Sequence, residues 1–210
     1  MKIIKPFYTI ETPIDGNYVL KLIEKAGRTC YKSENSINDD SAIRFVKSLI
    51  ERGHLSVIEH YSVSVRIICD RGVSHELVRH RPASYTQEST RYCNYTKGKF
   101  DGELTFIEPC FWQNKESEEY KIWESAMNRC ENDYKRLIEL GASPQEARSI
   151  LPNSLKTEIL VTMNLREWRH FFTLRTAKAS HPQMREICIP LLNDFKGKIP
   201  IVFDDIVVED

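Results

Sequence analysis

Four of the six histidines in the sequence fall between His54 and Tyr92, so a metal site is the first chemistry to test. His75-Glu76 followed by His80 comes close to the zinc pattern H-E-x-x-H, but one residue too many separates the histidines. Residues five apart point roughly 140° apart around a helix, so these two imidazoles cannot bind one ion together. The reversed pattern H-x-x-E-H fails too, because Ser56 stands where its first histidine would be. The sequence therefore predicts no metal site.

Arginines form two basic zones that could bind an anion. Residues 71–92 hold four Arg and two Glu, and residues 148–185 hold seven Lys or Arg and two Glu. Guanidinium, hydroxyl and amide groups present the donors that bind a phosphate or a pyrimidine edge. In the first zone these residues are Arg79, Arg81, Arg91, Ser84, Gln87 and Ser89. No glycine-rich phosphate loop is present, so side chains would have to hold any nucleotide. Alternatively, Arg79 and Arg81 are the solvated end of a helix, where positive charge is favourable.

The charge balance limits what these arginines could bind. The 210 residues carry 30 Lys and Arg against 30 Asp and Glu, which excludes a bulk polycation but permits a focused anion site. No apolar run approaches the ~20 residues that span a bilayer, and no signal peptide is evident, so we expect a cytoplasmic protein. The six cysteines lack a C-x-x-C pair, which predicts free thiols.

The periodicity of the first half predicts the elements that position the first basic zone. Residues 2–10 and 61–69 have strand character, and the second of these alternates apolar and polar side chains. Helices are expected from Asp15 or Asn17, from Asp39 or Asp40 to Gly53, and from Gly72 to about Arg81, closed by Pro82. Residues 84–92 have no clear period.

The second half predicts a similar mixture. We expect a short strand at 104–107, an amphipathic helix at 115–140, a helical turn from Ser143 and a strand at 157–163. Asn164 with Glu167 should start the helix that carries Arg166, His170 and Arg175. A helix from Pro182 should kink or break at Pro190, before a final strand after Pro200. The prediction is an α+β (mixed α/β) fold, one domain over residues 1–210 with a central, largely antiparallel sheet flanked by helices.

Four blocks of sequence together resemble the flavin-dependent thymidylate synthases. Arg79-His80-Arg81, seven further residues and Ser89 match the family signature of R-H-R, seven residues and Ser. The blocks from His54 to His60 and from Glu146 to Pro152 are similar to the family's H-x-[ST]-x-x-E-H and E-A-R-x-x-L-P. Asn164-x-Arg166, His170 and Leu174-Arg175 are similar to its last block. The resemblance covers roughly residues 40–195, with departures at Glu76, Thr86 and Thr90.

The resemblance implies an enzyme that converts dUMP to dTMP. The carbon donor would be 5,10-methylenetetrahydrofolate, and NADPH would supply reducing equivalents through FAD. The family needs no cysteine that adds to the uracil, in agreement with the lack of an evident activated thiol here. Negative charge at N3 and O2 of the uracil must be stabilised to make C5 electron-rich, and a permanently charged guanidinium suits that role.

The same resemblance assigns roles to individual residues. Arg175 is the expected catalytic residue. The expected dUMP-binding residues are Glu76, Arg79, Gln87, Ser89, Thr90, Arg91, Arg148 and Arg175. The expected FAD-binding residues are His54, Ser56, Arg79, His80, Arg81, Gln87, Asn164, Arg166 and His170. His54 would also lie near the entering folate.

The resemblance further implies a homotetramer with sites shared among subunits, small-molecule substrates, and no nucleic-acid or membrane partner. A rival hypothesis is a non-catalytic nucleotide or RNA-binding module that uses the same arginines. It predicts salt-dependent binding to polyanions and no flavin absorbance. The zero net charge and the absence of an RNP-type or helix-turn-helix signature argue against it.

Overall fold

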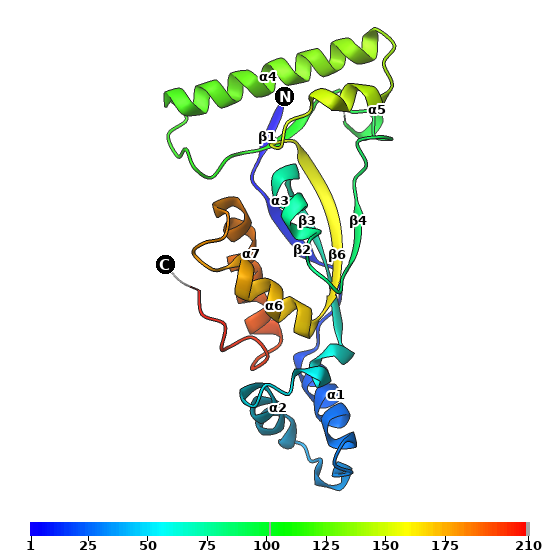
Figure 1. Cartoon of the computed structure of the whole chain (residues 1–210), viewed down its shortest axis with the longest axis vertical. Helices are drawn as coiled ribbons and strands as arrows, with labels where there is room; N and C mark the ends of the chain where they lie inside the picture. Colours follow the sequence, from blue (N-terminus) through cyan, green and yellow to red (C-terminus); the bar gives the residue numbers. More distant parts are fainter. Residues whose placement is uncertain (101, 209–210) are drawn as a thin grey trace. The chain divides into compact units, whose positions relative to one another are not determined.

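The computed structural model describes residues 1–208 except residue 101 (Figure 1). The chain divides into two compact units, each composed of segments that alternate along the sequence. The first unit contains Met1–Phe7, Ile67–Arg79 and Thr86–Leu160. The second contains Tyr8–Arg66, His80–Tyr85 and Val161–Asp210. The expectation of one domain stays a prediction, whereas the mixed α and β architecture is confirmed.

A four-stranded antiparallel sheet has the strand order β2-β3-β6-β4. Its strands are β2 (Phe7–Ile10), β3 (Ser62–Asp70), β6 (Lys156–Asn164) and β4 (Ser84–Gln87). Alternate side chains of β6 are buried, namely Thr157, Ile159, Val161 and Met163, as the period of a strand with one covered face requires. A separate pair joins β1 (Lys2–Ile4) in parallel to β5 (Thr105–Ile107), with Ile3 opposite Phe106.

Two predictions about strands need correction. The single strand expected at 2–10 is two strands that belong to different sheets, and Pro6 lies between them without a backbone N–H to donate to a ladder. The segment without a clear period at 84–92 contains the strand β4. Its side chains are Ser, Tyr, Thr and Gln, and none is fully buried, so no apolar alternation marks it.

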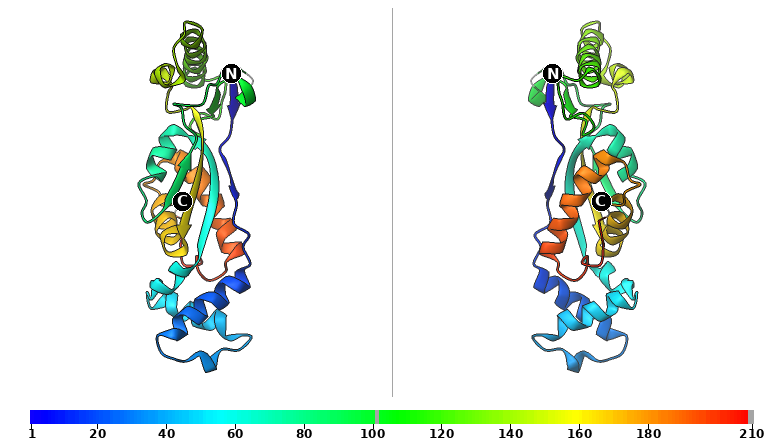
Figure 2. Two further views of the ribbon diagram at one scale, coloured as in Figure 1. Left: turned by 90° about the vertical axis from the view of Figure 1, so that its right-hand side faces the viewer. Right: turned by 90° about the vertical axis from the view of Figure 1, so that its left-hand side faces the viewer.

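Helices form most of the second unit. The helices α1 (Gly16–Thr29) and α2 (Ser41–Glu51) pack against each other and lie side by side in Figure 1 and in both views of Figure 2. The 3-10 segment η2 (Leu55–His60) contacts α1 and also α6 (Leu165–Arg175). The helix α6 packs on α7 (Pro182–Lys198) through buried aromatic rings, with the centroids of Trp168 and Phe195 5.2 Å apart.

The C-terminal predictions are partly wrong. Of the kink or break expected at Pro190, the break is wrong: the helix α7 continues to Lys198, because Ile187, Leu191 and Phe195 on its buried face keep it packed. The strand expected after Pro200 is absent from the described residues 201–208, of which 201–205 form turns and a bend. Arg169 holds these turns by donating to the carbonyl oxygen of Val202 and to both carboxylate oxygens of Asp205.

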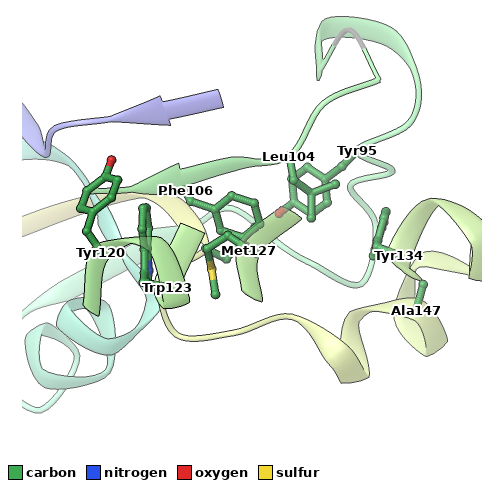
Figure 3. Close-up of a cluster of buried hydrophobic side chains, with 9 residues drawn as sticks. Tyr95, Leu104, Phe106, Tyr120, Trp123, Met127, Tyr134 and Ala147 are labelled. Atoms are coloured by element: carbon green, nitrogen blue, oxygen red, sulfur yellow. The ribbon is translucent and has the colours of Figure 1, made fainter. Parts of the chain in front are cut away.

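The first unit has its own hydrophobic core (Figure 3). The long helix α4 (Glu118–Glu139) contributes Tyr120, Trp123, Met127 and Tyr134 to it. These side chains pack with Tyr95, Leu104, Phe106, Ala147 and Leu155 from other segments of the same unit. The turn α5 (Pro144–Ala147) begins with a capping box of Ser143 and Glu146, which confirms the predicted start.

The helix α3 (Arg71–Leu77) is shorter than predicted, so Arg79 and His80 follow the helix rather than belong to it. Asp70 caps α3 by accepting a hydrogen bond from the backbone N–H of Val73 at 2.6 Å. The six cysteines are unpaired, as expected. Across residues 1–100 and 102–208, no helix is both long and apolar enough to cross a bilayer.

Candidate active site

A cleft of about 550 Å³ lies in the second unit at the N-terminal end of α6. This volume is in the range of small-molecule sites. Its walls come from η2, from the segment after His80 and from the first turns of α6. The lining residues are Leu55, Glu59, Arg81, Pro82, Asn164, Arg166, Glu167, Arg169, His170 and Thr173.

Asn164 starts α6 at the edge of this cleft. Its Oδ1 accepts a hydrogen bond from the backbone N–H of Glu167 at 2.9 Å, which confirms the predicted cap. The remaining N–H groups of the first turn carry the positive end of the helix dipole, which favours an anion there. The cap therefore fixes both the direction of α6 and the placement of Arg166 and Glu167 at the cleft.

Two arginines of the cleft, Arg81 and Arg166, have exposed side chains. Nη1 of Arg166 lies 2.6 Å from Oε1 of Glu59, and their side chains are 54% and 41% exposed. An ion pair in water contributes at most about 1 kcal/mol, so Arg166 can exchange Glu59 for the anionic group of a ligand. Nη1 of Arg81 donates to the carbonyl oxygen of His80 at 2.6 Å, and the guanidinium lies over the ring of Tyr85.

His80 is buried, with an exposed fraction of 5%, and joins two charged residues of α6. Its Nε2 accepts a hydrogen bond from Nε of Arg175 at 2.9 Å. Its Nδ1 lies 3.4 Å from Oε1 of Glu167. Burial, with the nearby charges of Arg175 and His170, lowers the pKa of His80 to about 4. His80 is therefore a neutral imidazole at neutral pH, and its unprotonated Nε2 can accept the hydrogen bond from the charged Arg175.

One ligand atom each from His80, Glu167 and His170 lies within 4.8 Å of the others. The composition of this group is compatible with a metal ion. However, Arg175 donates to His80 at 2.9 Å, so its guanidinium would repel a cation placed there. We interpret the three side chains as a polar cluster around the histidine that holds Arg175.

A second cleft, of about 430 Å³, lies in the first unit. Arg71, His75 and Arg148 give it positive charge, and Nη1 of Arg148 donates to Oγ1 of the buried Thr90 at 3.3 Å. The other lining residues are Gln145, Ser149, Leu151, Pro152, Asn153 and Leu155. Arg148 itself is exposed. Of the expected dUMP-binding residues, this cleft brings together Thr90 and Arg148.

The remaining expected residues of the first unit lie around its strands and α3. Nε2 of Gln87 donates to Oγ of Ser74 at 2.9 Å and to Oγ1 of Thr157 at 3.1 Å, so its amide orientation is fixed. Oγ of Ser89 accepts from the backbone N–H of Arg91 at 3.3 Å. The side chains of Arg91 and Arg79 are exposed, whereas Glu76 is half-buried.

In the second unit the structure gathers most of the expected FAD-binding residues. Arg81, Asn164, Arg166 and His170 line the cleft, and His80 contacts His170 ring to edge at 5.9 Å. His54 and Ser56 stand in or beside η2 with exposed side chains, but they are outside the cleft lining.

Some lining residues were not predicted as site residues. Glu59 belongs to the H-x-[ST]-x-x-E-H block, so its position in this motif could have identified it as a site residue. Glu167 carried only the signal of a helix cap, because its contact with His80 joins residues 87 positions apart in the sequence. Arg169 and Arg71 line the clefts as well, and no motif singles them out, whereas His75 stands out in the sequence only through the rejected zinc pattern.

Residues 17–201 match a family model described as "Thymidylate synthase complementing protein". The chain is 34% identical over 191 residues to the flavin-dependent thymidylate synthase of Geobacter sulfurreducens. This alignment covers 86% of this chain and 78% of the relative. It is 36% identical over 174 residues to the enzyme of that name from Pyrococcus furiosus, over 82% of this chain and 70% of the relative.

Solved structures are similar as well. A UMP/dUMP methylase, PolB from Streptomyces cacaoi, bound with 5-Br dUMP, superposes with a TM-score of 0.78 at 20% sequence identity. The superposition covers 97% of this chain and 96% of that one. At this level of identity the likeness concerns the fold.

Proposed function

The chain belongs to the flavin-dependent thymidylate synthases, and from this premise we propose which reaction it catalyses and which side chains take part. The reaction is the reductive methylation of dUMP to dTMP. Methylenetetrahydrofolate supplies the carbon and becomes tetrahydrofolate, and NADPH is oxidised to NADP⁺. The observation that carries the proposal is a guanidinium, that of Arg175, held by a buried neutral imidazole beside a cleft with a basic lining.

The donor set of the second-unit cleft fits FAD. Guanidinium groups of Arg81 and Arg166 suit a diphosphate, and the N-terminal turn of α6 adds its dipole. Asn164, His170 and Thr173 offer polar atoms suited to hydroxyl groups of the cofactor. These residues would hold FAD, which supplies the redox chemistry when bound.

The first-unit cleft fits the anionic end of a nucleotide. Arg148 and Arg71 provide two guanidinium groups, and His75 and the hydroxyls of Thr90 and Ser149 add further polar contacts. We assign the dUMP phosphate to this cleft, with Arg148 as its main ligand. The expected contacts of dUMP with Glu76, Arg79, Gln87, Ser89 and Arg91 belong to the same proposal.

Arg175 is the proposed catalytic residue. A guanidinium remains charged at any physiological pH, so it can stabilise negative charge on N3 and O2 of the uracil as C5 becomes nucleophilic. His80 accepts only through Nε2, which holds Nε of Arg175 and so limits the rotation of the guanidinium plane. His80 and Arg175 thus bind and orient, and no cysteine is assigned to the reaction.

A simple assay tests the proposal. The purified protein is reconstituted with FAD and incubated with dUMP, methylenetetrahydrofolate and NADPH, and dTMP is quantified by chromatography. Omission of each component in turn serves as the control. We expect dTMP only in the complete mixture, with one NADPH oxidised per dTMP. A folded protein that binds no flavin would contradict the assignment.

A homotetramer, the use of NADPH rather than NADH, and a cytoplasmic location are further parts of the proposal. They are supported by the resemblance to the family. Sedimentation of the FAD-loaded protein and a comparison of the two nicotinamide cofactors test the first two directly.

A further inference from the structure

Glu167 is a buried carboxylate for which the reaction outlined above has no assigned use. Its exposed fraction is 6%, and its Oε1 has no hydrogen-bond partner among the described residues. An unpartnered buried acceptor costs free energy, so such atoms usually have a reason to be retained. Oε1 lies 3.4 Å from Nδ1 of His80, and His170 lies in the same cluster, with one ligand atom within 4.8 Å of those of Glu167 and His80.

The tautomer of His80 depends on what its two nitrogens face. A neutral imidazole carries one proton, and the other nitrogen is an acceptor. Nε2 receives the Nε–H of Arg175 at 2.9 Å, so Nε2 must be the acceptor and the proton must be on Nδ1. Nδ1 is the atom that faces Glu167. A carboxylate at this position favours the Nδ1–H tautomer and disfavours the Nε2–H tautomer.

The contacts of His80 restrict both its backbone and its ring, so the ring cannot easily move to present a different atom to Arg175. Its carbonyl oxygen accepts from Nη1 of Arg81 at 2.6 Å and from the hydroxyl of Tyr85 at 3.0 Å, which fixes the backbone. The ring packs edge to face on Phe171, with centroids 4.9 Å apart. The remaining variable is the position of the ring proton.

We propose that Glu167 is a positioning residue: it holds His80 in the Nδ1–H tautomer, so that Nε2 accepts from Nε of Arg175 and limits the rotation of its guanidinium plane. This inference rests on the proposed function for what Arg175 does, but the tautomer itself does not depend on turnover. Without Glu167 the Nε2–H tautomer becomes accessible, and two N–H donors then face each other at Nε of Arg175.

The tautomer is measured by nitrogen-15 NMR of FAD-loaded protein labelled at histidine, with the His80 signals assigned from a His80→Asn variant. We expect Nδ1–H in the wild type and a mixture or the Nε2–H form in Glu167→Ala. An Nε2–H tautomer in the folded wild type would overturn the proposal without any variant. Retention of Nδ1–H in Glu167→Ala would overturn it too.

Kinetics separate positioning from a structural role. Because small misplacements of a catalytic group are costly, we expect kcat of Glu167→Ala and Glu167→Gln to fall roughly 10-fold to 100-fold. The rates are measured at saturating FAD, because Glu167 also lines the cleft proposed for FAD, and KM for dUMP should stay near the wild-type value. Glu167→Asp, which keeps the carboxylate, should recover part of kcat. Unchanged kcat in Glu167→Ala, or equal losses in the Asp and Gln variants, would contradict the positioning role.

The matched control is Glu24→Gln. Glu24 is another buried carboxylate of the second unit, 1% exposed, and it pairs with Arg28 at 2.7 Å outside the cleft. This variant should lose stability but keep kcat and the His80 tautomer. If wild-type protein forms no dTMP while the tautomer still responds to Glu167, the proposed function fails and the positioning inference stands. If kcat of both variants falls in parallel with stability, Glu167 is structural.

Discussion

The Nε of Arg175 lies 2.9 Å from Nε2 of His80, so the last residue of α6 is held by a histidine 95 positions earlier in the chain. Such a contact favours catalysis by a charged group, because the group already has its orientation before the substrate binds and need not reorganise during the reaction.

Replacement of Arg175 by Ala should remove most turnover while FAD is retained. Loss of one preorganised donor to a developing negative charge typically costs about 100-fold to 1000-fold in kcat, and we expect a loss of this size. The measurement is the rate of dTMP formation at saturating dUMP, together with the flavin absorbance of the purified variant. Lys178→Ala, which removes an exposed charge just after α6, is the control. Near-normal turnover of Arg175→Ala would refute the assigned role.

The two clefts should respond separately to mutation. Arg148→Ala should raise the dissociation constant of dUMP about 10-fold or more and leave FAD binding unchanged, because a charge-assisted phosphate contact is lost. Arg166→Ala should weaken FAD and leave dUMP binding to preloaded protein unchanged. Titration calorimetry with each ligand measures both effects. The opposite pattern would mean that the ligands are assigned to the wrong clefts.

The buried neutral state of His80 makes stability depend on pH. In the unfolded chain its pKa is near 6.5, whereas burial with the charges of Arg175 and His170 lowers the folded pKa to about 4. Between these values the unfolded chain binds more protons, so the free energy of unfolding falls as pH drops from about 6.5 toward 4. Glu167, His170 and Arg175 face the ring from α6, and Arg81 follows it in the chain.

Urea unfolding at pH 6.5 and pH 5 measures this dependence. We expect the wild type to be less stable at pH 5, and His80→Asn to lose less stability over the same interval. A larger pH dependence in His80→Asn would show that His80 does not bury its neutral form.

Arg169 should control the C-terminal turns. Its side chain is 13% exposed and donates to Asp205 at 2.6 and 2.7 Å and also to the carbonyl oxygen of Val202. We expect Arg169→Ala to lower the free energy of unfolding by roughly 1 to 3 kcal/mol, since hydrogen bonds to charged groups are lost. Hydrogen exchange of residues 201–208 should increase at the same time.

Arg136→Ala is the control for this effect, because Arg136 pairs with Glu139 on an exposed surface of α4. Exposed pairs contribute at most about 1 kcal/mol. Equal destabilisation by Arg169→Ala and Arg136→Ala, with unchanged exchange at residues 201–208, would contradict the anchoring role of Arg169.

Local sequence signals predicted those elements that depend on local physics. Asn164 with Glu167, and Ser143 with Glu146, are capping patterns, and the structure has helices beginning at both. Alternation in β3 and β6 likewise requires only neighbouring residues. The failures have non-local causes: β4 has no apolar alternation, and α7 continues past Pro190 because its buried face is packed.

In the candidate site, too, some residues can be predicted from the sequence, whereas contacts between distant residues cannot. The resemblance pointed to Arg81, Asn164, Arg166 and His170, and these residues line one cleft. It gave no signal for the contact of Glu167 with His80, because a tautomer is set by which nitrogen faces which partner. That information exists only in the folded chain.

Formation of dTMP tests the central claim most directly. FAD-loaded protein is incubated with dUMP, methylenetetrahydrofolate and NADPH, and the nucleotide products are separated. The account predicts dTMP in amounts equal to the NADPH oxidised, with almost none from Arg175→Ala. Folded, flavin-loaded wild-type protein that forms no dTMP would contradict it.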